Sequence, residues 1–209
     1  MNIDTILIYT IVSFFYITSP GPAIVLAILN GLNTNLKILA ISSFANISGL
    51  FILSSISILG LGTLLTTNII VFNIVKFIGA FYLIYLGIKM IKNGKELNLN
   101  NNLSSKNKTN LNYFLESFFL AVTNPKPILF FTAIFPQFLN LNNEILPQFI
   151  VMTSIFLIIS FSSLFTYGFI AKKSKKLFTN KSHMHWFHKI TGGIFIGMGI
   201  ALSQFKNIQ

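Results

Sequence analysis

Six long apolar runs, separated by short polar segments, constrain the fold of this chain more than any other feature. Each run is long enough, or nearly so, to cross a hydrocarbon core of ~30 Å at 1.5 Å per helical residue. Only 9% of the residues are charged and 53% are hydrophobic, whereas a soluble domain carries about 25% charged residues. We therefore expect an all-α integral membrane protein with six transmembrane helices. The six runs cover residues 3–29, 38–65, 68–91, 113–138, 145–171 and 187–206.

Two proline pairs interrupt the first and the fourth of these runs. Pro20-Gly21-Pro22 lies in the second half of the first run, and Pro125-Lys126-Pro127 lies near the middle of the fourth. Proline lacks a backbone N–H and breaks or kinks a helix. In hydrocarbon, the freed backbone groups are tolerated only against protein or a wet cavity. We therefore expect helices one and four to be broken, with both breaks lining a functional site.

The paired interruptions also predict an internal repeat. With three runs in each half, the second half enters the membrane in the opposite sense, so the repeat is inverted. A second match supports this, because Lys76-Phe77-Ile78-Gly79-Ala80 resembles Lys189-Ile190-Thr191-Gly192-Gly193. We expect two inverted three-helix repeats, residues 1–92 and 113–209. An Asn-, Ser- and Lys-rich cytoplasmic linker loop, residues 93–112, joins them.

The distribution of lysines predicts the orientation in the membrane. The net charge is +11, but the lysines form short clusters between apolar runs, so we do not expect nucleic-acid binding. If successive loops alternate between two sides, almost all of these lysines fall on one side. The positive-inside rule makes that side cytoplasmic and places the N- and C-termini outside. The lysines concerned are Lys37, Lys89, Lys92, Lys95, Lys106, Lys108, Lys172, Lys173, Lys175, Lys176 and Lys181.

A Pro-x-Pro break supplies two kinds of polar backbone group. Carbonyl groups before the break lose their helical partners, and the half-helix after it presents N–H groups and a partial positive charge. The carbonyls suit an ammonium group, and the helix N-terminus suits a carboxylate. Two breaks that meet near the midplane therefore predict a site for a zwitterion. Its expected residues are Pro20, Gly21, Pro22, Asn124, Pro125 and Lys126.

Lys126 is the ionisable residue deepest inside an apolar run. A charged side chain at the bilayer centre costs ~2.5–3.5 kcal/mol even on the insertion scale, so it needs a partner and a task. We expect it to contact a substrate carboxylate, and the alternative is that its side chain reaches along the unwound segment to water. Asn124 either offers its amide to the cavity or caps the half-helix, and Gln137 lies further along the same run.

Two other polar positions complete the expected site. Asn46 belongs to a cluster with Ser42, Ser43 and Ser48 in the second run, which forms either a polar cavity wall or hydrogen bonds between helices. Glu116 lies near one end of the fourth run, eight residues before Asn124. It is the candidate for a proton-coupling carboxylate, and the alternative is a solvated acid at the membrane interface.

The motifs around the two breaks resemble those of the LysE/RhtB family of bacterial amino-acid exporters. The first is Pro20-Gly21-Pro22, and the second is Asn124-Pro125-Lys126 followed by Phe130-Phe131 and Pro136-Gln137-Phe138. The stretch from Gly79 to Gly87 and the glycine-rich last run also look familial, so the resemblance covers essentially the whole length.

This resemblance implies a six-span carrier in the bacterial cytoplasmic (inner) membrane. The carrier would export amino acids or close derivatives and would be driven by the proton gradient. The family often has an acid or an amide where this chain has Ala23, and a small residue where it has Pro127. We expect no cofactor and no metal, and a homodimer is plausible for so small a carrier.

Other functions fit fewer of the sequence features. A metal-cation or other inorganic-ion exporter of the same fold would use the histidines of segment His183–His188 as a cytoplasmic collector, but their spacing fits no compact helical pair. A membrane scaffold or receptor would leave the paired breaks and Lys126 unexplained. We do not expect an enzyme, because the chain has no hydrolytic triad, phosphate loop or zinc signature, and no cysteine.

Overall fold

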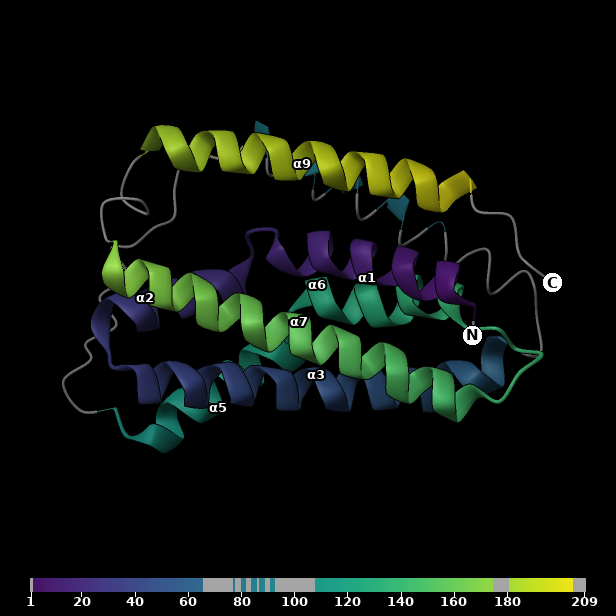
Figure 1. Ribbon diagram of the computed structural model, residues 1–209, viewed down its shortest axis with the longest axis horizontal. Helices are drawn as coiled ribbons and strands as arrows, with labels where there is room; N and C mark the ends of the chain where they lie inside the picture. Colours follow the sequence, from purple (N-terminus) through teal and green to yellow (C-terminus); the bar gives the residue numbers. More distant parts are fainter. Residues whose placement is uncertain are drawn as a thin grey trace.

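The computed structural model describes residues 2–65, 108–174 and 181–204, together with nine isolated residues between 77 and 92. All regular structure among these residues is helical (Figure 1). The elements are α1 (Ile3–Thr18), α2 (Pro22–Asn33), α3 (Leu36–Leu65), α5 (Asn110–Thr123), α6 (Pro125–Leu129), η2 (Phe130–Ile134), η3 (Phe135–Phe138), α7 (Ile145–Lys173) and α9 (Lys181–Gln204). The all-helical expectation is therefore confirmed for the part of the chain that the structure describes.

The first apolar run is broken at the predicted place. Helix α1 ends at Thr18, Ser19 is extended, and α2 begins with Pro22 at its first position. Proline is favoured there because a first-turn N–H has no helical partner anyway. The axes of α1 and α2 differ in direction by 58°.

The fourth run is broken as well, and it continues irregularly after the break. Helix α5 ends at Thr123, and the segment Lys126–Phe138 leaves at 44° to it. After α6 the backbone widens into a single π-helical turn, η2, and then tightens into the 3₁₀ turn η3. Such π-helical turns are rare in proteins and occur frequently at functional sites. Helix α5 begins at Asn110, three residues before the predicted run, because the Thr109 side chain caps it by accepting from the N–H of Asn112.

Two to four membrane crossings are supported among the described residues. The segment Leu36–Leu59 and helix α7 are each long and apolar enough to cross a membrane. Each bent pair would add one more crossing if it counts as a single span. Helix α9 covers the sixth predicted run but is not among these, and most of the third run lies outside the described residues. The inverted six-helix arrangement therefore stays a prediction.

The helices lie side by side along the long axis of the molecule (Figure 1). Helices α1 and α7 run in one direction, and α3, α5 and α9 run in the other. The N-terminus and the last turn of α9 consequently lie at the same end of the molecule.

Glycines allow α2 and α7 to approach closely near their C-terminal ends. A Cβ atom on Gly31 of α2 would lie 2.0 Å from the carbonyl oxygen of Gly168 on α7. A Cβ atom on Gly168 would lie 2.4 Å from a methyl group of Leu39 on α3. Small residues at helix contacts are how membrane helices pack backbone against backbone. This contact fixes α2 against α7 beyond the first break.

An aromatic cluster fills the space between α1, α7 and the irregular segment. Phe130 and Phe131 contact Phe156 of α7 at ring-centroid distances of 4.5 and 4.8 Å. Phe130 also contacts Tyr16 of α1 at 4.8 Å, and all four of these rings are buried. The cluster thus packs the second break against the first.

Candidate functional site

The two helix breaks meet through Lys126. This lysine lies one residue inside α6, and its ammonium group reaches back to Ser19 between α1 and α2. Its Nζ atom donates to the carbonyl oxygen of Ser19 at 2.8 Å and lies 2.6 Å from the Ser19 hydroxyl. It also lies 5.1 Å from the centroid of the Tyr16 ring, close enough for a cation–π interaction. The polar partners that a cation needs in an apolar bundle therefore come from the other break.

Tyrosine hydroxyl groups donate to two further carbonyl groups at the breaks. Tyr167 of α7 donates to the carbonyl oxygen of Thr18 at 2.9 Å. Tyr16 donates to the carbonyl oxygen of Lys126, so a second hydrogen bond joins the two breaks. The Ser19 hydroxyl donates to the carbonyl oxygen of Tyr16 at 2.6 Å. Paired in this way, the irregular backbone becomes tolerable at membrane depth.

The two half-helices after the breaks differ at their N-termini. Asn124 caps α6, because its side-chain oxygen accepts from the N–H of Lys126 at 3.1 Å. Helix α2 has Gly21 at the capping position and so has no side-chain cap. A Cβ atom on Gly21 would lie 3.6 Å from Nζ of Lys126. The positive end of α2 and the ammonium group of Lys126 are thus neighbours, an arrangement that favours an anion.

A cavity lies at this meeting point. Its volume is about 50 Å³, several times the ~10–15 Å³ that one water molecule needs. Its lining combines apolar walls with a few polar groups, which is typical of small-molecule sites. The lining residues are Tyr16, Ile17, Ser19, Gly21, Ala23, Ile24, Asn46, Leu50, Ala121, Asn124, Lys126, Pro127, Phe156, Ser160 and Leu164.

The structure places four of the residues expected from sequence together at this cavity, namely Gly21, Asn46, Asn124 and Lys126. The remaining ones lie elsewhere. Pro20 and Pro22 shape the first break without lining the cavity, and Pro22 is exposed. Pro125 is the first residue of α6. Gln137 lies in η3, away from the cavity lining.

Three site residues were not singled out from the sequence as binding residues. They are Tyr16, Ser19 and Tyr167. Both tyrosines carry a hydroxyl group within an apolar run, and Ser19 directly precedes the first proline. A search for donors to the carbonyl groups that the breaks release would have pointed to such hydroxyls, but only the fold shows which of them reach.

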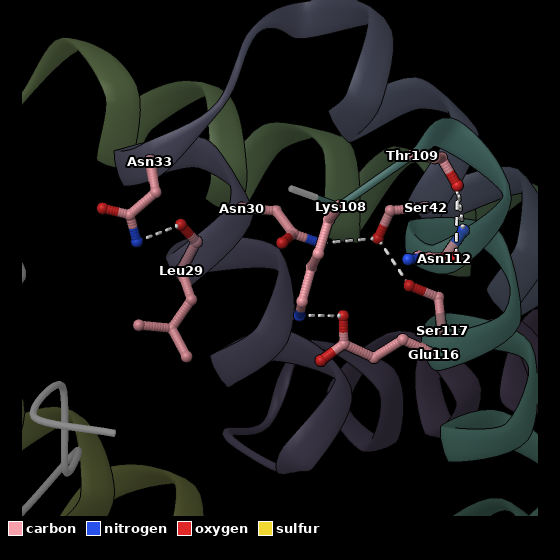
Figure 2. A network of polar contacts seen from close by, with 9 residues as sticks. All are labelled: Leu29, Asn30, Asn33, Ser42, Lys108, Thr109, Asn112, Glu116 and Ser117. Atoms are coloured by element: carbon pink, nitrogen blue, oxygen red, sulfur yellow. Dashed lines mark hydrogen bonds and ion pairs between the residues drawn. The ribbon is translucent and has the colours of Figure 1, made fainter. Parts of the chain in front are cut away.

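Glu116 lies outside the cavity, in a polar network between α2, α3 and α5 (Figure 2). Its carboxylate forms an ion pair of 2.9 Å with Lys108, and both side chains are partly exposed. Beside it, the amide of Asn30 donates to the hydroxyl of Ser42 at 2.9 Å, and Ser42 lies 2.7 Å from the hydroxyl of Ser117. Ser42 therefore hydrogen-bonds between helices, which is one of the two roles expected for its cluster.

A helical bundle with a cavity between two discontinuous helices is typical of membrane translocators. The family of LysE type translocators matches residues 14–204. The chain belongs to this family.

Similar proteins are membrane proteins or efflux proteins of nearly the same length. The membrane protein YrhP of Bacillus subtilis is 30% identical, over 94% of this chain and 97% of its own. A membrane protein of Vibrio cholerae is 28% identical, over 99% of this chain and all of its own length. A homoserine/homoserine lactone efflux protein of Salmonella typhi is 27% identical, over 95% and 96%. No solved structure matches this chain.

Proposed function

We propose that this translocator exports amino acids or close derivatives across the bacterial cytoplasmic membrane and binds them in the cavity between the two helix breaks. The observation that carries the proposal is the contact of Lys126 with Ser19, because it puts an ammonium group, backbone oxygens and a free helix N-terminus in one small space. These are the groups that a zwitterion requires. The names of the Salmonella relatives make homoserine and its lactone the first substrates to test.

The two charges of an amino acid would be held by different groups. A carboxylate fits between Nζ of Lys126 and the N-terminus of α2 beside Gly21. An α-ammonium group fits the carbonyl oxygen of Ser19, to which the Lys126 ammonium now donates, with Asn46 and Ser160 on the cavity wall. Binding would thus exchange the bond between Lys126 and Ser19 for two bonds to the substrate. Because that bond joins the breaks, its exchange would couple binding to movement of the two halves.

The driving force would be the proton gradient, with Glu116 as the coupling carboxylate. Its ion pair with Lys108 holds the segment before α5 to that helix. Protonation of Glu116 would remove the negative charge and release this contact. Substitution by glutamine should therefore abolish transport driven by a pH gradient while leaving exchange of substrate for substrate intact.

The orientation would place both chain ends outside. The start of α3, the start of α5 and the last turn of α7 lie at the end of the bundle opposite to the N-terminus (Figure 1). Lys37, Lys108 and Lys172 belong to or adjoin these helix ends, and the amine of Lys172 donates to the carbonyl oxygen of Thr34. By the positive-inside rule this lysine-rich end faces the cytoplasm. Cysteine substitutions at each end, labelled from outside intact cells, test the orientation, and sedimentation in detergent tests for a homodimer.

Counterflow in proteoliposomes tests the function. Vesicles loaded with unlabelled homoserine should accumulate labelled homoserine, and a survey of the other amino acids would define the selectivity. Active vesicles that exchange no amino acid and no derivative would refute the proposal.

In that case an inorganic-ion exporter would become the leading alternative. Its expected collector, the histidines of segment His183–His188, lies at the start of α9, where the side chains of His183 and His188 are outside the described residues. Replacing the three histidines should leave amino-acid export unchanged and should impair export of a metal cation.

A further inference from the structure

A stripe of polar side chains follows the buried face of α1. Tyr9, Ser13 and Tyr16 recur every three or four residues, so they share one face of the helix. Their exposed fractions are 0%, 0% and 1%, which means that this face is turned entirely into the bundle. Tyr16 lines the cavity beside Lys126. Ser13 and Tyr9 continue the stripe from the cavity toward the N-terminal end of the molecule.

Thr153 of α7 faces the same region from the other side. It lies between Phe149 and Phe156 on the buried face of α7 and is 3% exposed. Phe149 contacts Phe135 at 6.3 Å, and Phe135 contacts Tyr9 at 6.1 Å. The hydroxyl groups of α1 and of α7 therefore border one aromatic cluster, in the half of the bundle that carries the N-terminus.

These hydroxyl groups have no hydrogen-bond partner beyond one another in the described structure. The hydroxyl oxygens of Tyr9, Ser13 and Thr153 are buried, and the described group that interacts with the Tyr9 hydroxyl is the hydroxyl of Ser13, one turn along α1. The amide nitrogen of Gln137 is also buried without a described partner. Gln137 directly precedes Phe138, whose ring lies 5.3 Å from that of Tyr9. Folded proteins pair almost all such buried groups, with protein or with ordered water. Several such polar atoms around one aromatic cluster thus indicate bound water.

We propose that Tyr9, Ser13 and Thr153 bind a file of water molecules that conducts protons between the N-terminal end of the bundle and the cavity at Tyr16 and Lys126. Each water or hydroxyl in the file accepts one proton and releases another to its neighbour. One proton therefore moves along the file without any net change in its members. Gln137 would hold water near the outer end. The inference rests on the proposed export function and gives the proton a route that the cavity alone does not supply.

The position of the file suits proton-coupled export. Proton relays inside membrane bundles are commonly chains of ionisable side chains, and here water between the hydroxyl groups would take that role. The aromatic rings of Phe130, Phe135 and Phe138 belong to the buried core of this half, and such close packing would exclude a solute as large as an amino acid. A route that passes protons but not amino acids lets the proton gradient drive transport without letting the substrate leak through the same route.

The test removes the hydroxyl groups while keeping the shapes of the side chains. The triple variant Tyr9→Phe, Ser13→Ala, Thr153→Val is compared with Thr10→Val, a control on the same helix whose hydroxyl donates to the carbonyl of Ile6 at 2.7 Å. Proteoliposomes containing a pH-sensitive dye report proton flux, and labelled homoserine reports transport. We expect the triple variant to keep counterflow within about twofold and to lose at least tenfold in transport driven by a pH gradient. The control should retain both. A triple variant that transports with the gradient as fast as the unsubstituted protein would overturn the inference.

A second measurement is independent of any substrate. Hydroxyl-radical labelling modifies residues that touch water, so Tyr9 should be labelled although its side chain is fully buried. The labelling should fall severalfold in the double variant Ser13→Ala, Thr153→Val, in which the ring of Tyr9 is unchanged. An unlabelled Tyr9 contradicts the water file even if export is demonstrated. If the unsubstituted protein shows no counterflow, the proposed function is contradicted. The labelling result then still decides whether the water is present.

Discussion

The ammonium nitrogen of Lys126 lies 2.8 Å from the carbonyl oxygen of Ser19, although the two residues are 107 positions apart in the chain. This bond joins the break in the first apolar run to the break in the fourth. A lysine that must be stabilised away from water and a carbonyl group that has lost its helical partner satisfy each other. A substrate that carries both charges offers a carboxylate to the lysine and an ammonium group to the carbonyl group as alternative partners.

Replacing Lys126 should separate two substrates that differ in one group. Homoserine has a carboxylate, and homoserine lactone does not, whereas both have an α-ammonium group. We expect Lys126→Met to reduce homoserine counterflow at least 100-fold and to reduce lactone counterflow much less. The matched control is Lys173→Met, because Lys173 is exposed and lies over the ring of Phe169 far from the cavity. Equal losses for both substrates would show that Lys126 does not bind the carboxylate.

A methyl group on Gly21 should impair binding without unfolding the protein. The Cβ of Gly21→Ala would lie 3.4 Å from Cδ and 3.6 Å from Nζ of Lys126, which is ordinary van der Waals contact. It would nevertheless stand between the lysine and the N-terminus of α2, where we place the carboxylate. We expect the KM for homoserine to rise about tenfold with little change in thermal stability. Gly193→Ala, whose added methyl meets nothing within 4 Å, should leave both quantities unchanged.

A methyl group at Gly31 should destabilise the fold instead. The added Cβ would lie 2.0 Å from the carbonyl oxygen of Gly168, so α2 and α7 would have to move apart. Overpacking of this kind costs about 1–3 kcal/mol, and the gain in helix propensity from glycine to alanine offsets at most about 1 kcal/mol. Thermal unfolding in detergent should therefore begin at a lower temperature for Gly31→Ala than for Gly197→Ala, which has open space around it. Equal stabilities would mean that this helix contact is looser than described.

Removing the hydroxyl of Ser42 should weaken the contact of α2 with α3 and α5. Ser42 accepts from Asn30 and shares a hydrogen bond with Ser117, and all three side chains are buried. Ser42→Ala leaves two buried polar groups without this partner, at about 1–3 kcal/mol each. Ser55→Ala is the control, because its hydroxyl donates only within α3, to the carbonyl of Phe51. A Ser42→Ala variant as stable as this control would show that water replaces the lost hydroxyl.

The ion pair of Glu116 with Lys108 should matter for coupling and little for stability. Exposed and partly exposed ion pairs contribute about 0–1 kcal/mol, and both of these side chains are partly exposed. We expect Glu116→Gln to unfold at nearly the temperature of the unsubstituted protein, with substrate exchange preserved and gradient-driven transport lost. Gradient-driven transport at the unsubstituted rate would exclude Glu116 from proton coupling.

Local chemistry explains why the positions of the breaks were predictable. Pro22 and Pro125 begin new half-helices because proline lacks an N–H and has a fixed φ. The cap formed by Asn124 also follows from its place directly before such a start, and it was one of two roles expected for that residue. The 58° and 44° bends confirm both interruptions.

The partners across the bundle were not predictable in the same way. Tyr16 and Tyr167 look like ordinary polar residues of apolar helices until the rotation of each helix about its axis is known. Gln137 shares a run with Lys126, yet the π-helical and 3₁₀ turns between them place it away from the cavity lining. A helical wheel drawn with a uniform period cannot anticipate such a change of register.

The sequence by itself determined a helical membrane protein with two proline breaks, because length, apolarity and the missing N–H of proline act on each segment separately. It also determined the family, through motifs that lie at those breaks. Only the tertiary structure decided that the breaks meet, that Lys126 bonds to Ser19, and that the hydroxyls of Tyr9, Ser13 and Thr153 border one aromatic cluster. Those relationships depend on how helices far apart in the chain are rotated and packed, and close packing at contacts such as that of Gly31 with Gly168 fixes that arrangement.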